Sequence, residues 1–175
     1  MRGGTERTIN VAQGEHYIST RPGEVIVTVL GSCVAACLRD PVAQVGGLNH
    51  FLLPGPGDGE RSSVAYGLQA MEILIAGLIR VGADRRRLEA KLFGGAWLRP
   101  GLTDIGARNA AFAGQFLRRE GIRYLGGSLG GNQGRRIRYW PMTGEVQQFL
   151  LAASDAPLEQ PLRTSPKPND GLGRA

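Results

Sequence analysis

Hydrophobic and polar residues alternate along the first part of the chain, which is typical of β-strands with one buried face. Residues 8–19 alternate weakly and predict one or two short strands. Residues 24–29 are rich in β-branched side chains and predict a further strand that leads directly to Gly31. The N-terminal segment is therefore expected to contribute to a sheet.

Two apolar runs, residues 34–38 and 45–53, predict a β-hairpin. The four residues Asp40-Pro41-Val42-Ala43 lie between the runs, and they place Asp and Pro where a type I turn prefers them. A turn closed between the first and last of these four residues puts Cys33 directly opposite His50, on one face of the hairpin.

Two features leave this register open. Gly46-Gly47 is suited to a β-bulge, which shifts the pairing, and a shift of one residue moves Cys33 and His50 to opposite faces. The alternative to the strand is a short helix that starts near Ser32. That helix would place Cys33 at its N-terminus, where the pKa of a thiol is lowered.

Two longer segments, residues 63–81 and 105–120, carry apolar residues at helical spacing and predict amphipathic helices. Polar residues suited to an N-cap precede each segment, and a glycine suited to ending a helix follows each one. These residues are Ser62 or Ser63 with Gly82, and Thr103 or Asp104 with Gly121.

The rest of the chain predicts more sheet. Residues 88–93, 122–125, 136–140 and 145–151 have the pattern of strands, and the last two flank a turn. Residues 126–134 are rich in glycine, but they match neither G-x-G-x-x-G opening a helix nor a Walker A motif. We therefore predict a hairpin turn or loop at Gly131-Asn132-Gln133-Gly134 and no nucleotide site.

These elements predict an α+β fold, a single-domain layered sandwich of β-sheet with two amphipathic helices packed on it. We expect this domain over residues 7–153, after a flexible N-terminus at residues 1–6. Residues 154–175 contain four prolines among polar residues and few large apolar ones, so they predict a disordered tail.

Length and cysteine usage favour a cytoplasmic protein. The 175 residues suffice for one domain with a substantial core. The sequence has no apolar run near the ~20 residues of a membrane span, and its polar N-terminus is unlike a signal peptide. Its two cysteines lack the spacing of a disulfide framework, which fits a reducing compartment. We expect no insertion into a membrane.

The net charge of +6 raises the question of an acidic partner. Arginines gather at 85–87, at 118–119 and between 135 and 138. Nucleic acid and an acidic protein surface are both possible partners of such clusters. No nucleic-acid motif accompanies them and aromatic residues are 6% of the chain, so we expect mainly a solvated surface and no nucleic-acid binding.

Cys33 and His50 are the candidate catalytic pair, because a thiolate beside an imidazole is a nucleophile with an acid–base partner. Thr28 offers a hydroxyl that is placed to hold the far nitrogen of His50 and to fix its tautomer. Gly31 and Ser32 permit a tight turn whose backbone N–H groups point at a developing oxyanion. The alternative for Cys33 is a small buried hydrophobe.

Cys37 is expected to be a core residue because its neighbours are apolar. A disulfide to Cys33 is not expected, since Cα atoms four apart on a strand lie roughly 13 Å from each other. A metal site is not expected either, because the C-x3-C spacing has no second pair and the chain has two histidines.

The chain resembles CheD, the chemoreceptor glutamine deamidase family of bacterial chemotaxis. The resemblance covers roughly residues 8–150, and its motifs occur in family order. They are Leu30-Gly31-Ser32-Cys33-Val34-Ala35-Ala36-Cys37-Leu38-Arg39-Asp40-Pro41, Gly47-Leu48-Asn49-His50-Phe51-Leu52-Leu53-Pro54, Lys91-Leu92-Phe93-Gly94-Gly95-Ala96, Ile105-Gly106-Ala107-Arg108-Asn109 and Gly130-Gly131-Asn132-Gln133-Gly134-Arg135.

The resemblance implies a catalytic set of Cys33, His50 and Thr28 and a layered fold similar to the deamidating toxins of the cytotoxic necrotizing factor type. It implies a protein-glutamine amidohydrolase that forms a thioester on chemoreceptor glutamines without a metal or organic cofactor. Esterase action on glutamate methyl esters and binding to the phosphatase CheC are also implied. A non-catalytic chemotaxis adaptor is the alternative, and an RNA-binding protein is a third hypothesis.

Overall fold

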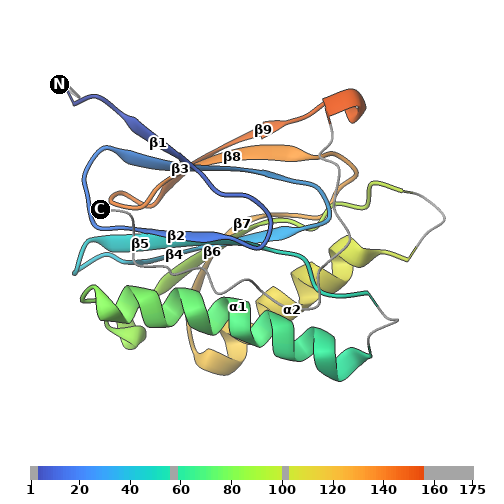
Figure 1. Cartoon of the computed structure of the whole chain (residues 1–175), viewed down its shortest axis with the longest axis horizontal. Coiled ribbons are helices and arrows are strands. Elements are labelled where there is room, and N and C mark those ends of the chain that lie inside the picture. Colours follow the sequence, from blue (N-terminus) through green and yellow to red (C-terminus); the bar gives the residue numbers. More distant parts are fainter. Residues whose placement is uncertain (1–3, 56–58, 100–102, 156–175) are drawn as a thin grey trace.

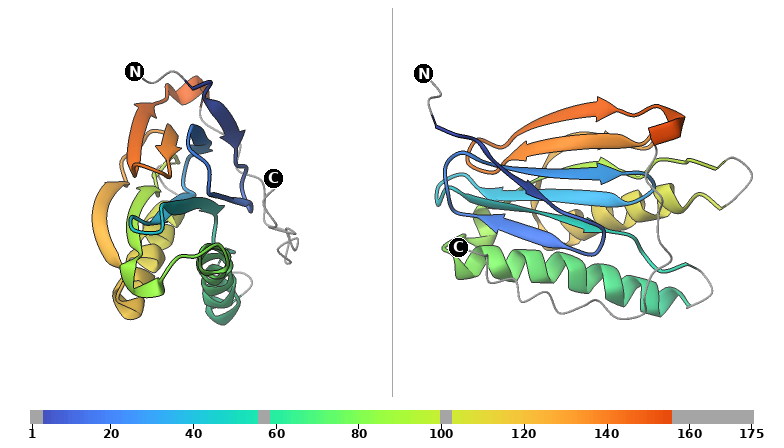
Figure 2. Two further views of the ribbon diagram at one scale, coloured as in Figure 1. Left: turned by 90° about the vertical axis from the view of Figure 1, so that its left-hand side faces the viewer. Right: turned by 45° about the horizontal axis from the view of Figure 1, so that its top comes forward.

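The computed structural model describes residues 4–55, 59–99 and 103–155, which form three layers (Figure 1). A four-stranded sheet is one outer layer and a five-stranded sheet is the middle layer. Two α-helices cover the outer face of the five-stranded sheet, and Figure 2 shows the same order of layers from other directions. The predicted α+β sandwich with helices packed on a sheet is confirmed, while the division of the strands between two sheets is not evident from the pattern alone.

The four-stranded sheet contains, in spatial order, β1 (Arg7–Asn10), β3 (Glu24–Leu30), β8 (Arg135–Trp140) and β9 (Glu145–Leu150). β1 runs parallel to β3, and the other neighbours are antiparallel. All residues of β3 except Val29 are buried, because this strand lies inside the sheet and packs on the middle layer. Thr28 is one of these buried residues.

The five-stranded sheet contains, in spatial order, β2 (His16–Ser19), β5 (Val45–Phe51), β4 (Val34–Asp40), β6 (Glu89–Gly94) and β7 (Arg123–Leu129). β6 and β7 are parallel, and the other neighbours are antiparallel. Every residue of β5 is buried, because one face of the strand meets the other sheet and the opposite face meets the helices.

The helical layer consists of α1 (Glu60–Arg80) and α2 (Ile105–Glu120), with short 3-10 turns at η2 (Arg85–Arg87) and η3 (Ala153–Asp155). The predicted ends of α2 are confirmed. The Asp104 side chain accepts a hydrogen bond from the N–H of Ala107 at 2.9 Å, and Gly121 ends the helix with φ 65°. This is the left-handed conformation that favours glycine.

The predicted N-cap of α1 at Ser62 or Ser63 is wrong. The helix begins after Gly59, and no side chain caps it. Ser63 lies inside the first turn instead, where it is buried and donates a hydrogen bond to the carbonyl of Pro54 at 2.9 Å. The hydroxyl therefore fastens the preceding loop to the helix.

Length and apolarity alone would allow α1 to cross a membrane. However, its buried side chains Met71, Leu74, Ile75 and Leu78 form a core with the middle sheet. This packing accounts for the apolar face that the helical spacing predicts. Among the described residues, α1 is the one helix that meets both criteria for a span.

The predicted turn over residues 131–134 is confirmed, while the strand before it is longer than the predicted 122–125. β7 continues to Leu129 alongside β6, with a shift of register between Ala90 and Leu92. Gly127 has φ 143°, and a Cβ atom there would lie 1.9 Å from the carbonyl oxygen of Leu92. The glycine therefore permits a close approach of two backbones, which a strand pattern does not reveal.

The predicted register of the β4–β5 hairpin is also wrong. Asp40 pairs with Val45, so four residues form the turn and His50 lies opposite Ala35. The predicted pairing of Cys33 with His50 differs from the observed one by two residues. A shift of two preserves the face of each side chain, so Cys33 and His50 still share the face towards the four-stranded sheet. Residues 31–33 form a bend before β4, so the alternative of a helix near Ser32 is wrong as well.

Asp40 organises the hairpin turn. Its carboxylate is fully buried and accepts hydrogen bonds from the N–H groups of Val42, Ala43 and Asp84, at 2.8 to 3.1 Å. Arg87 adds a two-pronged ion pair, with its closest contact at 2.8 Å. Burial alone would raise the pKa of Asp40, but Arg87 and these N–H groups outweigh it and hold the pKa below its usual range.

We expect the substitution Asp40→Ala to lower the free energy of unfolding by about 3 kcal/mol, because Arg87 and three backbone N–H groups lose their hydrogen-bond acceptor. Urea denaturation at pH 7 measures this loss. Arg86→Ala is the matched control, since Arg86 is highly exposed and pairs only with Asp84 among the described residues. Equal stability of the two variants would contradict this account of the turn.

The arginine cluster 85–87 is not an open basic face. Arg85 bonds to Glu72 at 3.1 Å and to Glu120 at 2.6 Å, which ties α1 to α2. Arg87 bonds to Asp40 at the far end of β4 from Cys33. Carboxylates therefore balance much of this charge, as expected for a solvated surface and not for a site that attracts nucleic acid.

The predicted limits of the domain fall close to the ends of the described residues. Residues 1–3 and 156–175, most of the predicted tail, lie outside the described residues. Residues 153–155 form the turn η3 directly after β9. A domain over 7–153 stays a prediction.

Candidate active site

Cys33 lies in the bend between β3 and β4, and the corner that follows β6 holds this bend in place. The carbonyl of Gly31 accepts a hydrogen bond from the N–H of Ala96 at 3.0 Å, and the carbonyl of Cys33 accepts one from Gly95 at 2.8 Å. Gly94 has φ 110°, and a Cβ atom there would lie 2.1 Å from the Cys33 carbonyl oxygen. The Gly94-Gly95 pair is thus needed for the backbone to reach the candidate nucleophile.

His50 lies near the end of β5, on the face that also carries Cys33. Its nearest polar partner is Thr28 on β3, whose Oγ1 is 2.7 Å from His50 Nδ1. The contact expected between Thr28 and the far nitrogen of His50 is therefore present. It joins the two sheets, because β3 and β5 belong to different layers.

The hydrogen bonds of Thr28 define the tautomer of His50. Thr28 Oγ1 is also 2.7 Å from the carbonyl oxygen of Val11, which can only accept. The single hydroxyl proton must go to Val11, so His50 Nδ1 has to donate to Thr28. In the neutral ring this leaves Nε2 with a free lone pair.

His50 Nε2 is buried and has no hydrogen-bond partner in the part of the chain that the structure describes. The side chain is 5% exposed, and its burial lowers the pKa to about 4, against the opposing effect of the Val11 carbonyl. The imidazole is thus neutral at pH 7 and able to take a proton at Nε2. A buried acceptor left without a donor is costly in a stable fold and common at a catalytic site.

We expect His50 to make the fold less stable in mild acid. The pKa of its imidazole is near 6.5 in the unfolded chain and about 4 in the folded one, so the unfolded chain binds an extra proton between these values. Stability should therefore fall by up to about 3 kcal/mol as the pH drops from 7 to 4. Urea denaturation across this range measures the slope.

The variant His50→Asn is the control for this slope, because it keeps a polar side chain that does not titrate. His16 contributes in the same direction, since burial also lowers its pKa, and both proteins retain it. The carboxylate of Asp40 adds a loss at lower pH in both proteins. An identical slope in the two proteins between pH 7 and pH 4.5 would show that His50 is not the responsible group.

Cys33 is 1% exposed and lies within the core between the two sheets. Its sulfur is 3.8 Å from Oε1 of Gln13, which belongs to the loop between β1 and β2. Tyr66 on α1 lies near Cys33, and burial first and Cys33 second raise the pKa of its phenol. Gln13 and Tyr66 were not expected in the site from sequence, because each comes from a different part of the chain.

Asn109 on α2 joins the two segments that carry the candidate pair. Its Nδ2 donates to the carbonyl of Ser32 at 2.8 Å, and its Oδ1 accepts from the N–H of Leu53 at 3.0 Å. Asn109 is fully buried. One side chain therefore fixes the residue before Cys33 and a residue three positions after His50. Its place in the motif Ile105-Gly106-Ala107-Arg108-Asn109 is the one signal of this role in the sequence.

The start of the loop after β5 is held by both helices. The carbonyl of Pro54 accepts hydrogen bonds from Ser63 on α1 and from Arg108 on α2, at 2.9 and 2.6 Å. These two bonds fix the backbone four residues after His50. Residues 56–58 lie outside the described residues.

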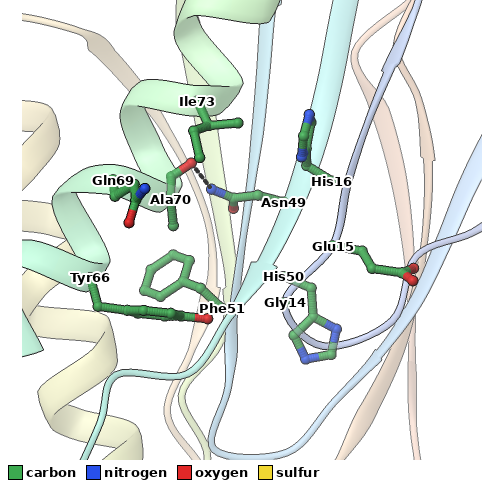
Figure 3. A pocket seen from close by; sticks show the side chains of 10 residues that line it. All are labelled: Gly14, Glu15, His16, Asn49, His50, Phe51, Tyr66, Gln69, Ala70 and Ile73. Carbon is green, nitrogen blue, oxygen red and sulfur yellow. Dashed lines mark hydrogen bonds between the residues drawn. The ribbon is translucent and has the colours of Figure 1, made fainter. Parts of the chain in front are cut away.

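A pocket opens beside His50, between α1 and the turn that precedes β2 (Figure 3). Figure 3 shows the His50 ring on one side, below the turn at Gly14 and Glu15, and Tyr66 across from it on α1. Asn49 and Ala70 form part of the pocket wall, and the side chain of Asn49 donates a hydrogen bond to the carbonyl of Ala70 at 3.4 Å. The pocket is lined by Gly14, Glu15, His16, Asn49, His50, Phe51, Tyr66, Gln69, Ala70 and Ile73.

Cys37 has the core position that the sequence predicts. It is 2% exposed, and burial raises the pKa of its thiol far above the usual range, although the nearby Lys91 acts against this. Neither Cys33 nor Cys37 forms a disulfide. A thiol that stays protonated is inert, so Cys37 is not a second nucleophile.

Comparison with known proteins places this chain among chemotaxis proteins. A family model described as "CheD chemotactic sensory transduction" matches residues 52–148. A protein of Caulobacter vibrioides (strain NA1000 / CB15N) is 53% identical over 160 residues, which cover 90% of this chain and 86% of the relative. One of Acidiphilium cryptum (strain JF-5) is 55% identical over 175 residues, covering 95% and 92%. Both are named "Probable chemoreceptor glutamine deamidase CheD".

Two solved structures have a distant likeness to the structure of this chain. Protein NMB0706 of Neisseria meningitidis has a TM-score of 0.46 at 10% identity, over 73% of this chain and 64% of that one. Protein YfiH of Bacillus licheniformis has a TM-score of 0.43 at 14% identity, over 65% and 49%.

Proposed function

Because this chain belongs to the CheD family, we propose that it is a protein-glutamine amidohydrolase that deamidates methyl-accepting chemotaxis receptors. The observation that carries the proposal is the identity of 53% and 55% to two relatives named chemoreceptor glutamine deamidase, over nine-tenths or more of this chain. The substrate is the cytoplasmic signalling domain of a receptor, and the enzyme acts in the cytoplasm.

Cys33 is the nucleophile of this proposal, and His50 is its acid–base partner. Support comes from their shared face, from the free lone pair of His50 Nε2 and from the neutral state of its imidazole at pH 7. The thiol gives its proton to Nε2 as the sulfur attacks Cδ of a receptor glutamine. The hydrogen bond of Thr28 to Nδ1 fixes the ring of His50 so that Nε2 accepts the proton of the thiol.

The tetrahedral intermediate then collapses with loss of ammonia. The C–N bond breaks as the nitrogen takes the proton from His50, because an amide anion does not leave unprotonated. A thioester remains on Cys33. Water attacks its carbonyl carbon, gives a proton to His50 and breaks the C–S bond, and the proton returns to the sulfur. The net change is glutamine plus water to glutamate plus ammonia.

Backbone N–H groups around Gly31, Ser32 and Cys33 are the proposed donors to the oxyanion. The carbonyls of Gly31 and Cys33 are both occupied by the corner after β6, which supports a fixed orientation of the intervening peptide groups. Donors that are fixed before the reaction stabilise the oxyanion without a cost of reorganisation.

The same thioester permits hydrolysis of glutamate methyl esters, with methanol as the leaving group. This methylesterase action and an association with the phosphatase CheC are further parts of the proposal. No step uses a metal or an organic cofactor.

The test is ammonia release from a purified receptor signalling domain that carries glutamines at its modification sites. Release that depends on both proteins supports the proposal. A receptor domain that binds the protein but yields no ammonia would instead favour the alternative, a non-catalytic adaptor.

A further inference from the structure

The side chain of Gln13 contacts the sulfur of Cys33. Its Oε1 lies 3.8 Å from Sγ, within the range for a thiol hydrogen bond. Gln13 is half-buried and belongs to the loop between β1 and β2. Nothing in the family match, which begins at Leu52, assigns this residue a role.

The loop that carries Gln13 is fastened to the strand of His50. The N–H of Gly14 donates to the carbonyl of His50 at 2.8 Å, and the N–H of His50 donates to the carbonyl of Glu15 at 3.0 Å. The two residues that directly follow Gln13 thus both pair with the backbone of His50. The position of Gln13 is therefore tied to the backbone of the candidate base.

The other side of the loop is fastened to the strand of Thr28. The N–H of Val11 donates to Val27 at 2.9 Å, and the carbonyl of Val11 accepts from Thr28. Within the loop, the N–H of Ala12 donates to the carboxylate of Glu15 at 3.0 Å. A side chain on a loop with this many bonds is held in place before a substrate arrives.

A carboxamide beside a thiol changes its best orientation during the reaction. With the proton on sulfur, Oε1 accepts the S–H, as in the structure. Once the proton has moved to His50, Oε1 of Gln13 would face a thiolate. A half-turn about the last side-chain bond of Gln13 then presents the N–H group of its amide to the sulfur instead. The carbonyl carbon of the substrate glutamine bonds to Sγ of Cys33. The oxygen on that carbon therefore develops its negative charge within reach of the Gln13 amide.

We propose that the side-chain amide of Gln13 is a donor of the oxyanion hole, which contacts the thiolate of Cys33 and then the tetrahedral intermediate. This inference rests on the proposed deamidase function and adds a side-chain donor to the backbone N–H groups. Gln13 is thus a catalytic residue for hydrolysis of both glutamine amides and glutamate esters, because both pass through the same oxyanion.

The test compares Gln13→Leu, which removes the amide, and Gln13→Glu, which keeps the shape but loses the N–H donor. We expect each to lower kcat for ammonia release by about 10²- to 10³-fold, with KM for the receptor domain changed less than about threefold. Gln115→Leu is the matched control, because Gln115 is exposed on α2, and it should match the wild type. Thermal unfolding of all four proteins confirms that they are folded.

A second measurement needs no receptor and so remains decisive if the deamidase proposal fails. The rate of Cys33 alkylation by iodoacetamide, followed against pH, reports the pKa of its thiol. Loss of the amide donor in Gln13→Leu should shift this profile to higher pH, and the added carboxylate in Gln13→Glu should shift it further. A role in folding alone would not produce this order.

Two results would overturn the inference. One is a Gln13→Leu protein with a kcat within twofold of the wild type and an unchanged alkylation profile. The other is peptide mapping that finds glutamate at position 13 in the wild type but glutamine in Cys33→Ala. That result would make Gln13 an internal substrate of Cys33 and not a donor.

Discussion

Replacement of Cys33 by alanine should abolish deamidation while the receptor signalling domain still binds. We expect kcat to fall by about 10⁴-fold or more, because the thioester route is lost and only binding and the oxyanion donors remain. Cys33 is 1% exposed, so the truncation leaves a small cavity in the core between the sheets. The loss of one sulfur atom there should cost stability modestly and leave the fold intact.

Cys37→Ala is the matched control for this experiment. Cys37 is the other cysteine, it is just as buried, and its thiol stays protonated because burial raises its pKa. The control should lose stability in a similar way and keep its activity. Ammonia release measures the activity, and co-sedimentation measures binding. Undiminished activity in Cys33→Ala would refute the nucleophile, and activity lost equally in both variants would point to packing instead.

His50→Gln should lower kcat by about 10³-fold, because it removes the group that carries the proton in both steps of the proposed mechanism. Thr28→Val should have a smaller effect, about tenfold to a hundredfold, since it frees Nδ1 and no longer selects the tautomer. Thr28→Ser should retain most of the activity because it keeps the hydroxyl. Steady-state kinetics of ammonia release at pH 7.5 gives the comparison.

The pH profile adds a result that packing cannot imitate. Burial lowers the pKa of His50 to about 4, so the acid limb of kcat/KM should lie below pH 6.5. A limb at or above 6.5, or equal losses in Thr28→Val and Thr28→Ser, would contradict the role that the hydrogen bonds give to Thr28.

The shared face of Cys33 and His50 could be predicted from sequence even though the hairpin register could not. Asp40 and Pro41 favour a turn, but four residues form it, and Gln44 has φ 54°. Glutamine seldom adopts this left-handed conformation, so the pattern favours a tighter turn. The resulting error of two residues leaves each side chain on its predicted face, which is why Cys33 and His50 still lie on the same side of the sheet.

The supporting contacts could not be predicted in the same way. Gln13, Tyr66 and Asn109 reach the site from the β1–β2 loop, α1 and α2, and no local pattern links these segments. The long helices were predictable because their apolar spacing reflects packing on one face. The start of α1 was not, because Gly59 leads into it without a capping side chain.

The basic clusters also need the structure for their interpretation. Arg85 and Arg87 form ion pairs with carboxylates of the same chain. Arg135 is buried and donates to the carbonyls of Ser128 and Gly130, so it braces the glycine-rich segment. A net charge of +6 therefore overstates the free cationic surface, which weakens the hypothesis of an RNA-binding protein.

The most direct test of the central claim is the intact mass of a receptor signalling domain after incubation with the protein in ¹⁸O-labelled water. Hydrolysis of a thioester on Cys33 predicts a gain of about 3 Da per modified glutamine in labelled water and about 1 Da in ordinary water. Cys33→Ala should give no gain, and Cys37→Ala should give the full gain. An unchanged receptor mass with the wild type, under conditions in which the two proteins bind, would contradict the account.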